Sequence, residues 1–197
     1  TEIMSNSLTK ESYYEGLTSY PAARCVRILN PLSADLNVMR QTLLFNTMEA
    51  VQLNANRRNG NLRLYEFGNC YFYDEAARDA EKPLSAYSEQ YRLAIAVTGA
   101  AVPQSWNAKP QASSFFTLRA VAEKLLRRFG LDIYALKCEP LQSDLFGDGI
   151  SLSAGNGREL LQMGGVAPRI RRAFDLKQEV YYLEMNFDAL VKSTRKH

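Results

Sequence analysis

The sequence is poor in the residues on which many catalytic and metal sites depend. One of its 197 residues is histidine, His197, the last in the chain. A histidine-based triad or zinc site is therefore not expected. The three cysteines, Cys25, Cys70 and Cys138, form no C-x-x-C pair. They predict neither a disulfide framework nor a zinc site, and we expect a reducing, cytoplasmic setting.

Long apolar runs and signal-like segments are also missing. No stretch approaches the ~18 apolar residues that a membrane helix needs, so no membrane association is expected. The first residues, TEIMSNS, lack the layout of a signal peptide. Because the chain starts at Thr1 rather than methionine, we expect it to be a fragment of a longer protein.

The glycines and acidic residues match no nucleotide or calcium motif. Glycine pairs at 147/149, 155/157 and 164/165 lack the G-x-x-x-x-G-K-[ST] pattern and favour turns over a phosphate cradle. Asp144 and Asp148 lack the spacing of a calcium loop. The sequence therefore predicts no catalytic, cofactor-binding or metal-binding residue in this chain.

The charge is small and unevenly distributed. The net charge is +3, and residues 158–197, with eight Lys/Arg and five Asp/Glu, account for all of it. This excess is too weak to predict a dedicated nucleic-acid-binding domain, although it permits RNA nearby. The basic run PRIRRAF, from Pro168, is more typical of a solvated helix face than of a phosphate contact.

Hydrophobic spacing predicts many strands and a few helices. With 46% hydrophobic and 11% aromatic residues, the chain can build a core. The expected strands span residues 2–8, 24–29, 35–40, 62–73, 91–99, 133–139, 149–154, 159–167 and 180–187. The expected helices span residues 10–15, 41–59, 113–129 and 168–174. Hairpin turns without regular β-α-β alternation predict an α+β fold on a largely antiparallel sheet. No linker divides residues 1–197, which we take as a single domain.

Two charged residues stand out within apolar patterns. Arg40 lies at the predicted start of a helix, where the macrodipole disfavours a cation by about 0.3–1 kcal/mol. Glu66 falls on the same face of its strand as Leu64 and Cys70, where a buried carboxylate needs a partner. Arg40 is a candidate. The two charges form either an internal ion pair or part of a contact with another subunit.

The aromatic residues allow two interpretations. Trp106 is expected to pack inward and anchor its loop. Tyr71, Phe72 and Tyr73 would form a platform for stacking bases only on an open strand face, and core or interface packing is favoured.

A longer pattern resembles a known family. The segment NPLSADLNVMRQTLL, a helix ending in NANRRNGN, and the strand motif RLYEFG are similar to the core of the bacterial phenylalanyl-tRNA synthetase beta subunit. Weaker similarity after Trp106 and in YYLEMNFDALV extends the resemblance over nearly the whole chain. It implies a class II aminoacyl-tRNA synthetase-like fold, an antiparallel sheet flanked by helices, in a catalytic-like module that has lost catalysis.

The resemblance also implies which chemistry this chain lacks. Class II synthetases carry Arg-x-Glu on the second signature strand, and the matching residues here are Leu64-Tyr65-Glu66. A final glycine-rich strand leading to a helix arginine is also missing. We therefore expect no adenylate formation by this chain. ATP and Mg²⁺ would be used by the whole enzyme, through the alpha subunit.

In the family, the region matching residues 30–59 belongs to the contact between subunits. The resemblance implies an alpha subunit as partner in an (αβ)2 heterotetramer, with tRNA(Phe) bound by the whole enzyme. The candidate interface residues are Pro31, Met39, Arg40, Leu44, Met48, Val51 and Glu66. An uncovered apolar patch there would favour self-association of the isolated chain.

Two other functions stay open at this point. One is a stand-alone class II-like paralogue with a regulatory ligand, which a metabolite bound in the sheet's cleft would favour. The other is an RNA-binding module, which the neutral charge of residues 1–157 disfavours.

Overall fold

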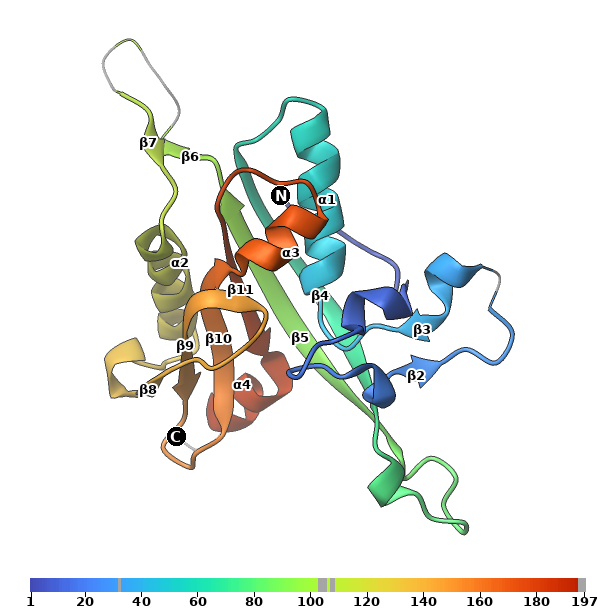
Figure 1. The fold of residues 1–197 in the computed structure, drawn as a ribbon. Coiled ribbons are helices and arrows are strands. Elements are labelled where there is room, and N and C mark those ends of the chain that lie inside the picture. Colours follow the sequence, from blue (N-terminus) through green and yellow to red (C-terminus); the bar gives the residue numbers. More distant parts are fainter. Residues whose placement is uncertain (32, 103–105, 107–108, 195–197) are drawn as a thin grey trace.

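The computed structural model describes residues 1–31, 33–102, 106 and 109–194, and His197 lies outside this set. Its centre is a six-stranded antiparallel sheet with the strand order β4-β5-β11-β10-β9-β8 (Figure 1). The strands are β4 (Leu62–Tyr73), β5 (Tyr87–Thr98), β8 (Lys137–Pro140), β9 (Phe146–Ser153), β10 (Glu159–Val166) and β11 (Val180–Asn186). The antiparallel α+β fold is thus confirmed.

Helices cover both faces of the sheet. Helices α1 (Leu44–Asn56) and α3 (Pro168–Ala173) pack on one face, and α2 (Phe115–Arg128) and α4 (Phe187–Thr194) pack on the other (Figure 1). Each face has its own hydrophobic core, because side chains alternate between the two faces along every strand. Leu64 and Tyr182 belong to the α1 face, and Leu93 and Leu183 to the α2 face.

The N-terminal residues form a second layer over the α1 face. Short strands β1 (Leu8–Thr9), β2 (Val26–Arg27) and β3 (Val38–Met39) make a small sheet in the order β1-β3-β2. Three 3-10 helices, Glu11–Tyr14, Ala22–Arg24 and Ala34–Leu36, connect these strands. Tyr14 and Val38 are fully buried against the same core as α1. The N-terminal layer therefore covers much of this face.

The beginning of α1 differs from the sequence-based expectation. The helix starts at Leu44 rather than Gln41, so Arg40 lies in the extended connection after β3 and not in a first helical turn. The macrodipole argument therefore does not apply to it. Arg40 is instead held by its backbone, whose N–H donates to Ser7 (2.9 Å) and whose carbonyl accepts from Tyr71 (2.8 Å).

Other predicted elements are confirmed or shortened. β4 has the predicted bounds, β5 lies in the sheet interior as expected, and Ser114 caps α2 through a capping box with Thr117. The strands expected at 2–8, 24–29, 35–40 and 133–139 are reduced to two to four residues each. The missing parts are loops and 3-10 turns, apart from an isolated parallel bridge between Glu2 and Tyr65 of β4.

The expectation for Trp106 is wrong. Its side chain is 97% exposed, beyond the small two-stranded arm of β6 (Ala100–Val102) and β7 (Gln111–Ala112). This arm projects from the sheet (Figure 1).

No helix in the described part of the chain is long and apolar enough to cross a membrane.

Candidate functional site

A buried ion pair joins Arg40 to Glu66 on the α1 face of the sheet. Arg40 Nη1 lies 3.0 Å from Glu66 Oε1, and both side chains are at most 3% exposed. Arg40 also donates to Ser5 Oγ (2.8 Å) and, through Nε, to the carbonyl of Asn69 (3.0 Å). Ser5 in turn donates its hydroxyl to Glu66 at 2.7 Å. The predicted partnership is confirmed, and it forms within this chain.

Gly68 makes room for this pair. A Cβ atom at this position would lie 2.1 Å from Arg40 Nη2 and 3.1 Å from Leu43 Cδ2. The guanidinium group therefore crosses β4 directly over a residue without a side chain. The glycine of RLYEFG is explained by this close approach rather than by backbone conformation.

The N-terminal segment closes the edge of β4 beside this pair. The N–H of Ile3 donates to the carbonyl of Tyr65 (2.9 Å), and the N–H of Tyr65 donates to the carbonyl of Thr1 (3.0 Å). Leu64 and Glu66, which match the positions of the class II Arg-x-Glu motif, are 4% and 1% exposed. These two positions face the protein interior and not a substrate site.

A second buried ion pair lies on the neighbouring strands. Arg92 Nη1 is 2.8 Å from Glu184 Oε1 and also donates to the hydroxyl of Tyr20 (2.8 Å). Glu184 accepts hydrogen bonds from Tyr182 (2.6 Å) and Thr42 (2.5 Å). Burial raises the pKa of Tyr20 to about 12, although the Arg92 cation opposes this rise. These groups satisfy one another and leave no free acid or base.

Sequence reasoning missed this second pair. The sequence signal was the same as that of Glu66. Glu184 lies two residues after Tyr182 in an apolar strand, so both side chains lie on the same, core-facing side. Arg92 comes just before the apolar run of β5 and lies opposite Gly68 in the register.

The predicted aromatic platform divides between core and surface. Phe72 is buried, as the packing interpretation expected, while Tyr71 and Tyr73 are half-buried on the other face of the strand. The guanidinium of Arg92 lies 5.2 Å from the centre of the Phe72 ring. This aromatic residue therefore stabilises an internal cation.

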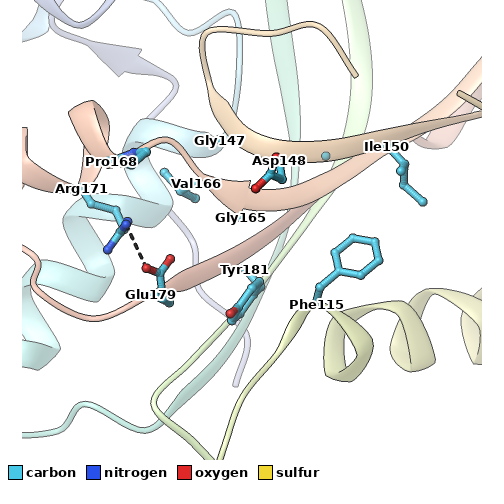
Figure 2. A pocket seen from close by; sticks show the side chains of 11 residues that line it. Phe115, Gly147, Asp148, Ile150, Gly165, Val166, Pro168, Arg171, Glu179 and Tyr181 are labelled. Atoms are coloured by element: carbon cyan, nitrogen blue, oxygen red, sulfur yellow. Dashed lines mark ion pairs between the residues drawn. The ribbon is translucent and has the colours of Figure 1, made fainter. Parts of the chain in front are cut away.

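A cleft with a volume of about 570 Å³ lies between the first turn of α2 and α3. Its floor is a β-bulge, where Gly147 and Asp148 of β9 lie opposite Gly165 of β10. Figure 2 shows Phe115 and Tyr181 on one side and the ion pair between Arg171 and Glu179 (3.0 Å) on the other. The remaining lining residues are Gly149, Ile150, Val166 and Pro168. The two charged groups at its end bind each other, and the cleft is lined by no cysteine or histidine.

Clustered metal ligands and an arginine in the helix after the final strand are two active-site features that the described residues could carry. No group of three or more His, Cys, Asp or Glu side chains is placed to hold a metal ion. β11 leads into α4, whose residues 187–194 include no arginine. The arginine expected after the final strand of a class II active site is thus missing from this helix.

The predicted interface residues occupy different depths. Arg40, Leu44, Met48, Val51 and Glu66 are buried within the chain, Met39 is half-buried, and Pro31 is exposed. Burial within the chain accounts for the apolar pattern of α1. The contact of these residues with another subunit stays a prediction.

Comparison with known proteins identifies the family. The family model described as the phenylalanyl tRNA synthetase beta chain CLM domain matches residues 1–187. The chain belongs to this family. The resemblance found in NPLSADLNVMRQTLL and RLYEFG is therefore confirmed.

Curated relatives of the CLM-domain family agree. The chain is 44% identical over 194 residues to the phenylalanine–tRNA ligase beta subunit of Bacteroides thetaiotaomicron, covering 98% of this chain and 24% of that protein. The corresponding protein of Porphyromonas gingivalis is 39% identical, covering 100% of this chain and 24% of the relative. This chain thus spans about a quarter of the length of these relatives.

Solved structures confirm the class II synthetase-like fold. A pyrrolysyl-tRNA synthetase structure from Desulfitobacterium hafniense superimposes with a TM-score of 0.69 at 14% identity, covering 97% of this chain and 61% of that one. A second structure of this synthetase from the same organism gives a TM-score of 0.68 at 13% identity, covering 97% and 62% of the two chains. At this identity the likeness concerns the fold alone.

Proposed function

We propose that this chain is the non-catalytic, synthetase-like core of a phenylalanine–tRNA ligase beta subunit. Its role is to support assembly with the alpha subunit in an (αβ)2 heterotetramer. The alpha subunit would activate phenylalanine with ATP and Mg²⁺ and charge tRNA(Phe), so this chain would itself need no cofactor. Membership of the CLM-domain family over residues 1–187 supports the proposal. A cytoplasmic location and a single domain over residues 1–197 are parts of the same proposal.

The observation that best supports the non-catalytic role is the burial of Leu64 and Glu66 on the α1 face of the sheet. A class II site needs an arginine on its signature strand to hold the transferring phosphoryl group. Leucine occupies that position here and is buried, while Glu66 is neutralised by Arg40. Opening this face would break a buried ion pair, which costs about 3–5 kcal/mol when one partner is lost. ATP binding would have to supply that free energy before any chemistry could begin.

The assembly role needs apolar surface near the predicted contact region, residues 30–59. Beside Pro31 in the loop between β2 and β3, Leu29 is 93% exposed, and on α1 Leu53 is 52% exposed. Met39, which lies between these two residues in the sequence, is half-buried. We propose that the alpha subunit covers these side chains, while the buried members of the predicted interface hold them in place. Without the alpha subunit the same side chains would favour self-association.

The assembly role is tested by copurifying the full-length beta subunit with a tagged alpha subunit. Leu29→Lys and Leu53→Lys, each made alone, should lower the amount of beta subunit recovered, because each places a charge in an apolar contact. Phe116→Asp is the matched control, since Phe116 is 72% exposed on α2, on the opposite face of the sheet. An acidic residue is also favoured in that first helical turn.

Unchanged recovery for both leucine variants would contradict the proposed contact. The catalytic part is tested by exchange of pyrophosphate into ATP with phenylalanine present. We expect exchange by the complex and none by this chain alone. Exchange by the chain alone would refute the non-catalytic role.

A further inference from the structure

Positive charge is concentrated at one end of the molecule. We call residues 54–63 and 168–179 together the basic end. They contain seven Lys/Arg and two Asp/Glu, a net charge of +5, while the rest of the chain carries −2. The total of +3 therefore conceals a strong separation of charge.

Hydrogen bonds bring the two segments of the basic end together. Gln178 Nε2 donates to the carbonyl of Gly60 (3.1 Å), and Gln52 Nε2 on α1 donates to the carbonyl of Phe174 (2.8 Å). The turn after α1 and the loop after α3 thus lie near each other at the same end of the sheet, where β4 and β11 begin (Figure 1). Charges more than 100 residues apart in sequence form one surface.

Most cations of the basic end are exposed and unpaired, Arg171 being the one that pairs with Glu179. In the described part of the chain, none of the five exposed cations that project from these two turns and α3 forms an ion pair with a carboxylate. They are Arg57, Arg58, Arg169, Arg172 and Lys177. Elsewhere on the molecule the exposed Arg27, Arg78 and Arg127 each pair with a glutamate. Among the described residues, the exposed Lys124, Arg128 and Arg158 are also unpaired, but they lie outside this concentration of charge.

Residues 54–59 of the basic end also belong to the predicted contact region, but the polar character of the basic end favours RNA over a protein partner there. Its surface presents the amides of Asn56, Asn59 and Asn61, and no large hydrophobic side chain of these segments is exposed. Protein interfaces usually need buried aromatic or aliphatic anchors. Arginine, lysine and asparagine side chains without such anchors are typical of contacts to phosphate and sugar, which position a nucleic acid without reading its sequence.

We propose that the basic end contacts the phosphate backbone of tRNA bound by the assembled enzyme. This inference rests on the proposed function, because it needs the tRNA that the alpha subunit charges. The contact would be independent of base sequence and sensitive to salt. The neutral average over residues 1–157 does not oppose it, because the segment carrying Arg57 and Arg58 meets α3 only in the folded structure.

The test neutralises three cations while keeping most of each side chain's length. Arg57→Gln, Arg58→Gln and Lys177→Gln are combined in the full-length beta subunit and purified with the alpha subunit. Binding of a tRNA(Phe) transcript is then titrated over a series of salt concentrations. Each lost phosphate contact should reduce the slope of log K against log salt by about 0.9, and the triple variant should bind at least about tenfold more weakly at ~0.1 M salt.

The matched control is Lys124→Gln, Arg127→Gln and Arg128→Gln on α2. These three cations are also exposed, and α2 packs on the opposite face of the sheet. The control should leave both affinity and slope unchanged. Equal losses in the two triple variants would mean that only overall charge matters and would overturn the inference.

Copurification separates this inference from the proposed function. Suppose that the basic-end variant recovered less alpha subunit, while the complex that did form bound tRNA with normal affinity. The basic end would then contact the alpha subunit, and the inference would be wrong. If the unsubstituted beta subunit failed to recruit the alpha subunit, the proposed function and this inference would both fail. If the complex formed normally but the basic-end variant bound tRNA as tightly as the parent, only this inference would fail.

Discussion

Replacing Gly68 with alanine should destabilise the fold more than a single added methyl group usually does. The new Cβ atom would lie 2.1 Å from Arg40 Nη2, so the guanidinium group would have to move. This group is not the free end of a flexible side chain. It is buried and bonded to Glu66 at 3.0 Å, and hydrogen bonds to Ser5 Oγ and the Asn69 carbonyl fix it further.

The magnitude lies between two limits. Overpacking a core usually costs about 1–3 kcal/mol, and breaking a buried ion pair by losing one partner costs about 3–5 kcal/mol. Gly68→Ala overpacks the core and also weakens the ion pair between Arg40 and Glu66 without removing either partner. We therefore expect the free energy of unfolding to fall by about 3 kcal/mol. For a domain of this size, that corresponds to a fall in Tm of roughly 6–12 °C.

The assay is thermal and urea unfolding of the variant beside Gly155→Ala. A Cβ atom added at Gly155 would meet no atom within 4 Å, and this residue does not have a positive φ, so alanine there should be neutral or slightly stabilising. In an Arg40→Met, Glu66→Leu background, Gly68→Ala should cost much less, because a flexible thioether can move aside. An unchanged Tm for Gly68→Ala, or an equal loss in both backgrounds, would refute the reasoning.

Two further predictions follow from polar and thiol groups elsewhere. Although partial burial opposes it, hydrogen bonds from the 18–19 turn, including one of 2.6 Å from the Thr18 N–H, hold the pKa of Asp144 below its usual 3.8. A carboxylate whose pKa is lower in the folded state stabilises the protein above the unfolded-state pKa, and this stabilisation is lost as pH falls through the folded-state pKa. Asp144→Asn should therefore lower the free energy of urea unfolding at pH 6 and have little effect at the acid limit. An equal difference at every pH would contradict this. Cys138 is exposed, while Cys25 and Cys70 are buried, and burial raises the pKa of both buried thiols. A thiol reagent should therefore modify one cysteine quickly in the native protein and all three after unfolding. Rapid reaction of two or more cysteines in the native protein would show that the buried thiols are accessible to solvent.

The sequence predicted those parts of the fold that depend on local periodicity. Alternation over residues 62–73 placed Glu66 on the same face as Leu64, and the single nearby cation in an unfavourable position, Arg40, proved to be its partner. The reason given for Arg40 was nevertheless wrong, because the polar residues Gln41 and Thr42 are buried and continue the apolar spacing without being helical.

Features that depend on distant segments could not be predicted in the same way. The Arg92–Glu184 pair joins strands that are 92 residues apart, and its hydrogen bond to Tyr20 comes from the N-terminal layer. The exposure of Trp106 could not be predicted either, because a tryptophan in the sequence looks the same whether its indole packs on the core or faces solvent. Surface charge at the basic end also arises only where the two segments meet.

The closed edge of β4 has a consequence for the aggregation of the chain. A 12-residue outer strand with free amides and carbonyls is a template on which unrelated extended chains can add. Here Thr1, Ile3 and Arg40 occupy those groups at Arg63, Tyr65, Asn69 and Tyr71. The opposite edge, β8, is four residues long and carries lysine and proline, both of which discourage strand addition. Arg40, which neutralises Glu66, thus also occupies backbone groups of β4 to which another extended chain could otherwise bind.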